Sequence, residues 1–115
     1  MAFPSRVLGA GTSGGTTTAI CGDVANTLTA AGSSASDALA LSAVFNRTTT
    51  TAASTGVKLP PAEAGAVCFV VNSGANSLTV YPQTGSTIDA GASVSIAAAG
   101  RTMFFATSST QWFSK

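Results

Sequence analysis

Residues 69–85 read FVVNSGANSLTVYPQTG, and this stretch gives the clearest indication of the fold. Runs rich in Val, Leu, Thr and Tyr flank the small polar segment NSGANS, and a second polar segment, PQTG, follows. β-Branched and aromatic residues favour strands, whereas Gly, Asn, Ser and Pro favour turns. The stretch therefore predicts a β-hairpin between residues 66–72 and 77–81, followed by a turn at 82–85.

The rest of the chain shows the same alternation of strand-like runs and turns. Further strands are predicted, one or two within residues 17–31 and one each at 35–51, 86–90, 93–97, 101–109 and 110–115, the last two as a closing hairpin. Residues 35–51 are predicted as one long, bent strand because apolar residues alternate there and four threonines follow. A helix from Ala38 to Phe45, capped by Ser36, is the alternative.

Strands about ten residues apart, with turn signals between them, are typical of an all-β sandwich or barrel. The prediction is an all-β domain over residues 17–115, sandwich or jelly-roll-like, with no internal repeat. Residues 1–16 are rich in Gly, Ser and Thr without periodicity, and they predict an extended N-terminal arm.

The arm contains one motif that suggests a nucleotide site. Gly9, Gly11 and Gly14 match G-x-G-x-x-G, which in dinucleotide sites joins a strand to a helix. The flanking residues read RVL and GTTTAI, which favour neither a strand before the motif nor a helix after it. No cofactor is therefore expected.

Composition restricts the kind of partner. Of the 115 residues, 8% are charged, the net charge is +1 and 45% are hydrophobic. Five scattered basic residues do not form the concentrated positive face that nucleic acids or anionic membranes require, and no run approaches the ~20 apolar residues of a membrane span. A surface this poor in charge predicts coverage by partner subunits. A monomer with a Ser/Thr-rich surface is the alternative.

The sequence offers few groups for catalysis. It has no histidine, which excludes catalytic triads and imidazole metal sites. The acidic residues are scattered and are expected in structural roles, and Lys58 is expected to be solvated; the acids are Asp23, Asp37, Glu63 and Asp89. No catalytic, cofactor-binding or metal-binding residue is predicted, and the protein is not expected to be an enzyme. The pairing of Cys21 and Cys68 stays open, although the apolar run around Cys68 favours a buried thiol.

Aromatic residues fall within the predicted strands. They suit either a sugar-stacking platform or packing in a core or subunit interface, and packing is favoured; the residues are Phe69, Tyr81, Phe104, Phe105, Trp112 and Phe113. Because neighbouring strand residues point to opposite faces, Trp112 and Phe113 are expected to contact the core and a neighbouring subunit, one each.

Residues 37–112 resemble small virion proteins and virion-protein modules of tailed bacteriophages. The most specific parts are GVKLP at 56–60 and VVNSGANSLTVYPQTG at 70–85. The resemblance implies a head decoration (cement) protein that trimerises on the outer capsid surface and binds the major capsid protein, after synthesis in the bacterial cytoplasm. A receptor- or glycan-binding module of a tail fibre or tail protein is the alternative. Candidate contact surfaces are the arm, the Thr48–Thr51 run and the edge formed by residues 77–81.

Overall fold

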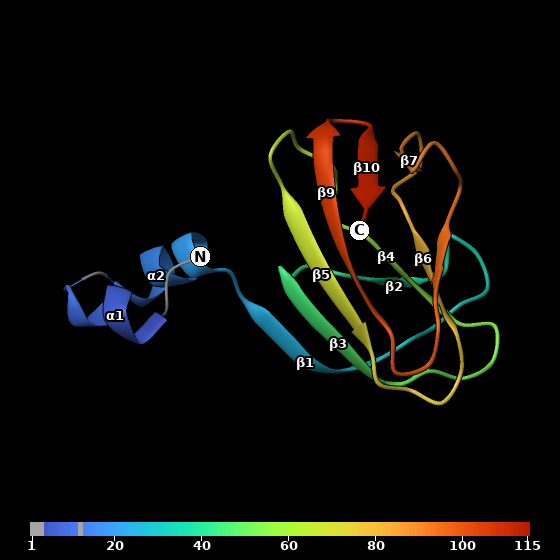
Figure 1. Cartoon of the computed structure of the whole chain (residues 1–115), viewed down its shortest axis with the longest axis horizontal. Coiled ribbons are helices and arrows are strands. Elements are labelled where there is room, and N and C mark those ends of the chain that lie inside the picture. The colour runs from blue at the N-terminus through green and yellow to red at the C-terminus, as the bar shows by residue number, and fades with distance from the viewer. Residues whose placement is uncertain (1–3, 12) are drawn as a thin grey trace.

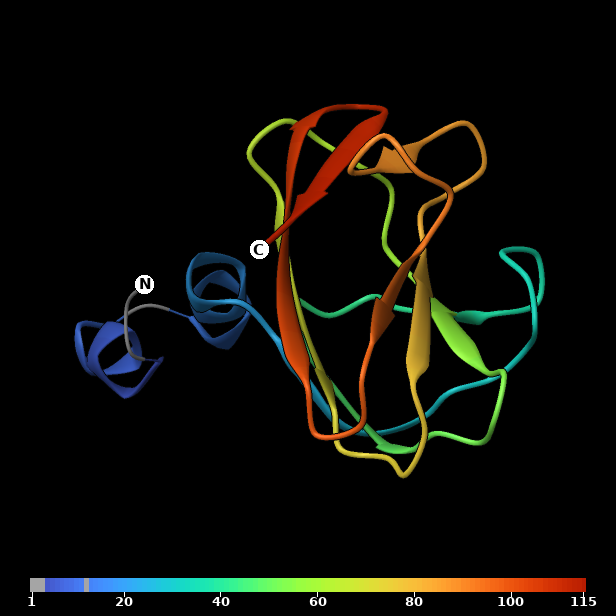
Figure 2. The same ribbon diagram turned by 45° about the vertical axis from the view of Figure 1, so that its right-hand side comes forward.

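The structure is a computed structural model that describes residues 4–11 and 13–115. Within these residues the chain is mainly β, which confirms the predicted class. Two short helices, α1 (Pro4–Gly9) and α2 (Gly14–Cys21), precede ten strands arranged in two sheets that face each other (Figures 1 and 2).

The two sheets differ in size. Sheet A has six strands in the spatial order β1 (Val24–Thr29), β3 (Phe45–Thr50), β5 (Val67–Asn72), β9 (Arg101–Ser108), β10 (Gln111–Ser114) and β7 (Thr87–Ile88). Sheet B has four strands in the order β2 (Leu39–Ala40), β4 (Gly56–Lys58), β6 (Leu78–Tyr81) and β8 (Val94–Ile96). The chain therefore crosses from one sheet to the other after almost every strand.

The first six strands wind as a coil. β1, β3 and β5 pair in parallel on one side, while β2, β4 and β6 pair in parallel on the other. Val24, Phe45 and Phe69 are paired across successive turns. This connectivity makes a short β-solenoid and corrects the predicted sandwich or jelly-roll, because jelly rolls are built from antiparallel Greek keys. It also supplies a structural repeat that was not expected.

The opening stretch does not form a hairpin. β5 pairs with β3 and β9, whereas β6 pairs with β4 and β8, so NSGANS carries the chain from sheet A to sheet B. The physical reason is burial: Val70 on β5 and Val80 on β6 are both fully buried and point into the space between the sheets. Placing the two strands in opposite sheets buries both apolar rows against each other.

A buried asparagine holds this crossing in place. Asn72 Oδ1 accepts hydrogen bonds from Thr51 Oγ1 (2.8 Å), Gly74 N (3.1 Å) and Thr48 Oγ1 (3.3 Å). Its Nδ2 donates to carbonyl oxygens of three residues, Asn76 (2.8 Å), Ile96 (3.1 Å) and Ala97 (3.2 Å). Asn72 is fully buried, and it ties three separate crossings between the sheets together.

The strand predicted over residues 35–51 is also divided between the sheets. Leu39–Ala40 belong to sheet B and Phe45–Thr50 to sheet A, with a corner at residues 41–44. Asn46 Nδ2 donates to the Ala43 carbonyl at 2.8 Å and fixes this corner. Residues 38–45 are not helical. The closing hairpin of β9 and β10 is confirmed, as are short strands within 86–90 and 93–97.

The arm predicted as extended over residues 1–16 contains α1 and the start of α2. One strand within residues 17–31 is confirmed as β1, whereas residues 17–21 continue α2. Residues 1–3 and 12 lie outside the described residues. Ser13 Oγ accepts from Thr16 N at 3.2 Å as an N-cap, and Gly22 follows α2 with φ +86°. The helices stand beside the β-domain along the longest dimension of a 44 × 30 × 22 Å molecule (Figure 1). Among the described helices, none is long and apolar enough to cross a bilayer.

The hydrophobic core lies between the sheets. Trp112, Phe104, Leu59 and Leu78 are the largest apolar side chains that are almost completely buried there. Paired residues of sheet B, including Val57 and Val80, add an inward column. The core thus uses one face of each sheet, and the opposite face of sheet A points away from it.

Candidate interaction surface

The aromatic residues divide between the core and the outside of sheet A. Phe104 and Trp112 are buried, whereas the next residues, Phe105 and Phe113, are half-buried. Successive residues of a strand point to opposite faces, so the second pair lies on the outside. As predicted, one of the two neighbours, Trp112, packs in the core. The contact of Phe113 with a neighbouring subunit remains a prediction.

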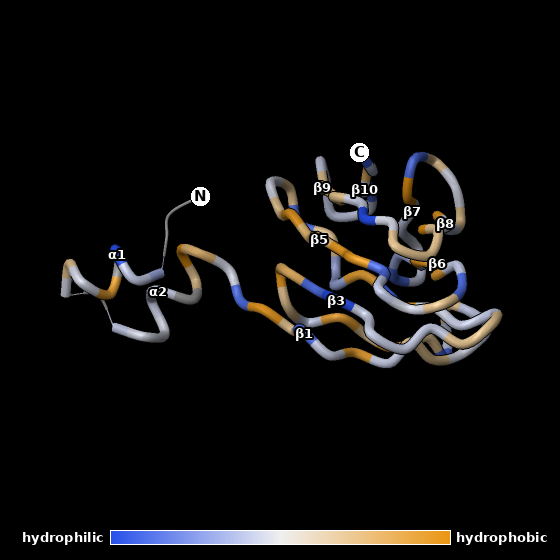
Figure 3. Tube along the Cα trace, turned by 60° about the horizontal axis from the view of Figure 1, so that its bottom comes forward, coloured by the Kyte–Doolittle hydropathy of each residue, from blue (hydrophilic) through white to orange (hydrophobic). Residues whose placement is uncertain are grey.

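We call this side of sheet A the outer face. Its outward-pointing side chains alternate with inward-pointing neighbours in β3, β5, β9 and β10 and continue onto the exposed start of β1. They are Val24, Phe45, Arg47, Thr49, Val67, Phe69, Val71, Arg101, Met103, Phe105, Thr107, Gln111 and Phe113. Figure 3 shows apolar residues along β1 and β5. Most of these side chains are apolar although they point away from the core, which makes this face an unusual surface.

Two stacked aromatic pairs lie on the outer face. The rings of Phe45 and Phe69 are nearly parallel, at 13°, with centroids 4.9 Å apart. Phe105 and Phe113 stack at 5.9 Å. In each case the pair joins neighbouring strands, because Phe45 is in register with Phe69 and Phe105 with Phe113. The stacks stabilise the sheet from outside while leaving part of each ring accessible.

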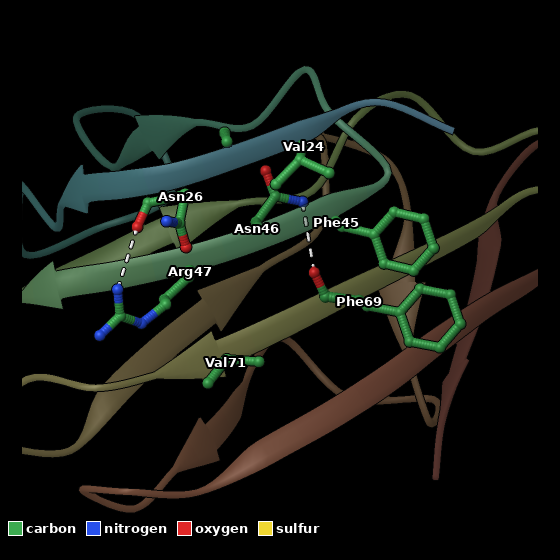
Figure 4. A pocket seen from close by; sticks show the side chains of 8 residues that line it. Val24, Asn26, Phe45, Asn46, Arg47, Phe69 and Val71 are labelled. Carbon is green, nitrogen blue, oxygen red and sulfur yellow. Dashed lines mark hydrogen bonds between the residues drawn. The ribbon is translucent and has the colours of Figure 1, made fainter. Parts of the chain in front are cut away.

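A shallow pocket of about 210 Å³ opens beside the first stack (Figure 4). It spans β1, β3 and β5 and is lined largely by apolar atoms, with Val24, Phe45, Phe69 and Val71 among the lining residues. Sites for small molecules usually measure ~300–1,000 Å³. The pocket is smaller than these and suits a side chain better than a cofactor.

A second row of outward side chains runs next to the aromatic row. Arg47, Val71 and Arg101 are in register across β3, β5 and β9, two residues along from Phe45, Phe69 and Met103. Arg47 donates to Ser73 Oγ at 3.0 Å and to the Asn26 carbonyl at 3.5 Å, both of which are uncharged (Figure 4 shows the second bond). The outer face therefore combines an apolar row with a cationic row.

The four acidic residues lie in separate loops, as expected for structural roles. Asp23 Oδ1 accepts from Val44 N at 2.8 Å, and Asp89 accepts from Ser114 N at 2.9 Å and from Ser114 Oγ. Asp37 accepts from the backbone and hydroxyl of Ser34, and these hydrogen bonds lower the pKa of its exposed carboxyl. Each of these three aspartates fixes a turn or a strand end.

The remaining polar candidates are equally dispersed. Glu63 is exposed in the loop before β5. Lys58, expected as a solvated lysine on an edge strand, is half-buried in β4, which lies between β2 and β6, so its expected position is corrected. Among residues 4–11 and 13–115, no three metal-ligating side chains gather where they could hold an ion. The structure brings none of the scattered polar candidates together.

The two cysteines are unpaired and buried. Cys68 is fully buried in β5, and burial raises the pKa of its thiol to about 12. A thiol that stays protonated behaves as a small apolar side chain, as the sequence indicated.

The glycine motif of the arm has a local structural explanation. Gly9 ends α1, Gly11 has φ +91° in the connection, and Gly14 begins α2. The motif thus joins two helices, whereas a dinucleotide site requires a strand before it.

One of the three predicted contact surfaces is corrected: β6 lies between β4 and β8, so residues 77–81 do not form an edge. In the Thr48–Thr51 run, Thr48 and Thr51 are buried around Asn72, whereas Thr49 is half-buried and Thr50 is exposed. The arm exposes Leu8, which is 48% accessible, and Ile20, which follows it in α2, is 53% accessible.

Sequence reasoning missed the outer face itself. The available signal was the run VCFVV, which is apolar at every position and therefore apolar on both faces of β5. Phe45 and Arg47 belong to the same surface because β3 pairs with β5, and the sequence alone does not show this pairing. Comparisons with family models, with curated proteins and with solved structures find no match to this chain.

Proposed function

We propose that the protein is a structural virion component of a tailed phage, a capsid decoration protein that binds the outer surface of the head. The proposal includes self-association as a homotrimer and attachment to the major capsid protein, without a catalytic step. The observation that carries it is the apolar outer face, on which Val24 is 69% accessible. Extended apolar surfaces on soluble domains commonly mark sites of protein association.

The rest of the molecule supports an assembly role. Exposed large apolar residues of the described chain also occur on the two N-terminal helices, at Leu8 and Ile20. A trimer that docks through three equivalent patches gains avidity from weak individual contacts. A protein that binds the assembled shell more tightly than its dissociated parts stabilises the shell by mass action.

The test is to locate the chain in purified particles. Quantitative mass spectrometry of separated heads and tails, with cryo-electron microscopy of the whole particle, gives location and copy number together. The proposal predicts many copies on the outer shell in a number that matches capsid symmetry. Heads that lack the protein should also open at lower temperature. Absence from heads would contradict it.

A receptor- or glycan-binding module of a tail protein is the second candidate. Its support is the pocket beside the stacked rings of Phe45 and Phe69, which Arg47 also lines. Aromatic surfaces with nearby polar groups bind sugars in many proteins. Few copies at the tail, together with binding to a glycan array that is lost in Phe69→Ser, would favour this function over decoration.

A further inference from the structure

The charges of the outer face are unbalanced in a way that suggests a partner. Arg47 and Arg101 both project from it, and their neighbour in register is Val71. The acidic residues Asp23, Asp37, Glu63 and Asp89 all lie in loops, so no acidic side chain belongs to a strand of sheet A. An isolated positive row beside an apolar row is complementary to a surface that carries carboxylates next to apolar side chains.

The spacing of the two rows sets a pattern for such a surface. Phe45 and Arg47 are two residues apart on β3, and the same offset separates Phe69 from Val71 and Met103 from Arg101. In an extended segment, side chains two residues apart also lie on one face, at about 6.6 Å along the strand. An extended segment lying along β3 with an apolar residue and a carboxylate at i and i+2 therefore matches both rows.

We infer that the outer face binds an acidic, apolar segment of another protein, with an apolar side chain in the pocket and a carboxylate on Arg47. The pocket of about 210 Å³ accepts a side chain, and Val24, Phe45 and Phe69 supply its apolar walls. The guanidinium has bonds to neutral acceptors only, so a carboxylate can add a charged partner. This inference deepens the proposed function, since it states the chemistry of the capsid surface that would be bound.

Charge also argues against the arm of a second copy as the occupant. Residues 1–22 contain no Asp or Glu, and they carry Arg6. Docking this arm on the outer face would leave Arg47 and Arg101 without an opposite charge. The partner is therefore a different, acidic chain.

The first test uses defined peptides and needs no phage particle. The probe is the terminally blocked peptide LTETLTET, in which Leu and Glu share one face, with LTQTLTQT and LTKTLTKT as matched controls. NMR titration of the 115-residue protein should move the amide signals of β1, β3 and β5, with binding at least about tenfold weaker for the Gln peptide and absent for the Lys peptide. Equal binding of the Glu and Gln peptides, perturbations confined to other strands, or no binding would overturn the inference.

The second test uses variants and separates the inference from the proposed function. Arg47→Glu combined with Arg101→Glu should weaken binding of LTETLTET about tenfold, while Lys58→Glu, which reverses one positive charge on sheet B, should have little effect. Because both arginines are exposed, unfolding midpoints should match the wild type. If wild-type protein binds heads and the double variant binds them equally well, the inference fails while the proposed function stands. If heads do not bind the protein but LTETLTET does, the proposed function fails and the inference stands.

Discussion

The two faces of β5 show how one strand serves two purposes. Cys68, Val70 and Asn72 point inward and are fully buried, whereas Val67, Phe69 and Val71 point outward and are half-buried. Both faces are largely apolar, yet only the inner one is enclosed by the second sheet. Packing within one chain therefore accounts for the apolar residues on the inner face of β5, whereas those on the outer face have no second sheet to cover them.

The largest effect is expected at the inner end of β5. Asn72→Ala removes all six side-chain hydrogen bonds of Asn72, so that buried groups such as Thr51 Oγ1 and the Ile96 carbonyl each lose one partner. We expect a loss of about 5 kcal/mol in the free energy of unfolding, because each buried unsatisfied group costs ~1–3 kcal/mol. Urea denaturation measures it. The exposed Asn26→Ala should lie close to wild type, and similar values for the two variants would disprove the role of Asn72.

Two neighbouring phenylalanines on β9 allow a direct comparison of the inner and outer faces of sheet A. Phe104→Ala creates a cavity in the enclosed core and should cost about 4 kcal/mol, whereas Phe105→Ala truncates a half-buried ring and should cost about 1 kcal/mol. Thermal and urea unfolding of both variants test the difference. Equal costs would mean that the outer face is as important to the monomer as the core.

A glycine substitution tests the crossing between the sheets. A Cβ at Gly74 would lie 2.3 Å from Thr51 Oγ1 and 2.6 Å from Thr51 N, so Gly74→Ala must displace backbone. We expect a loss of about 2–3 kcal/mol from this overpacking. The matched change Gly15→Ala, in α2 with no atom nearby, should be neutral or slightly stabilising. A wild-type unfolding midpoint for Gly74→Ala would contradict the geometry.

The buried thiol at Cys68, on the inner face of β5, gives a comparison that depends on pH. The pKa of Cys68 is raised from 9.0 to about 12 in the folded chain, so above pH 9 the unfolded chain ionises this thiol first. Its contribution to stability is complete below pH 9 and declines between pH 9 and 12, by up to ~1.4 kcal/mol per pH unit. Comparing wild type with Cys68→Ala removes the contributions of Tyr and Lys. Parallel stability curves for the two proteins would count against the buried thiol.

The sequence predicted the β class because period-two patterns and turn residues are local signals. Strand positions near 67–72, 78–81 and 101–114 follow from these signals. The partners of each strand do not, because NSGANS is equally compatible with a hairpin and with a crossing between sheets. The decision depends on the contacts of Asn72 with Thr51 and Ile96, which are distant in sequence.

The candidate surface was less predictable than the fold. Its aromatic content was visible in the sequence, but the pairing of Phe45 with Phe69 required the parallel register of β3 and β5. The helices of the arm were missed because Gly and Thr disfavour helix, although Ser13 before the segment and Gly22 after it are helix-end signals. In α2, Ser13 and Gly22 cap the two ends and offset the weak helix propensity of the residues between them.

The position of Asn72 also has a consequence for how the chain emerges from the ribosome. Its side chain bonds to groups as far along the chain as Ile96 and Ala97. During synthesis, the first two turns of the coil leave the exit tunnel before these acceptors exist. Nascent chains shorter than this point cannot complete the junction, so cooperative folding must wait until translation has passed it.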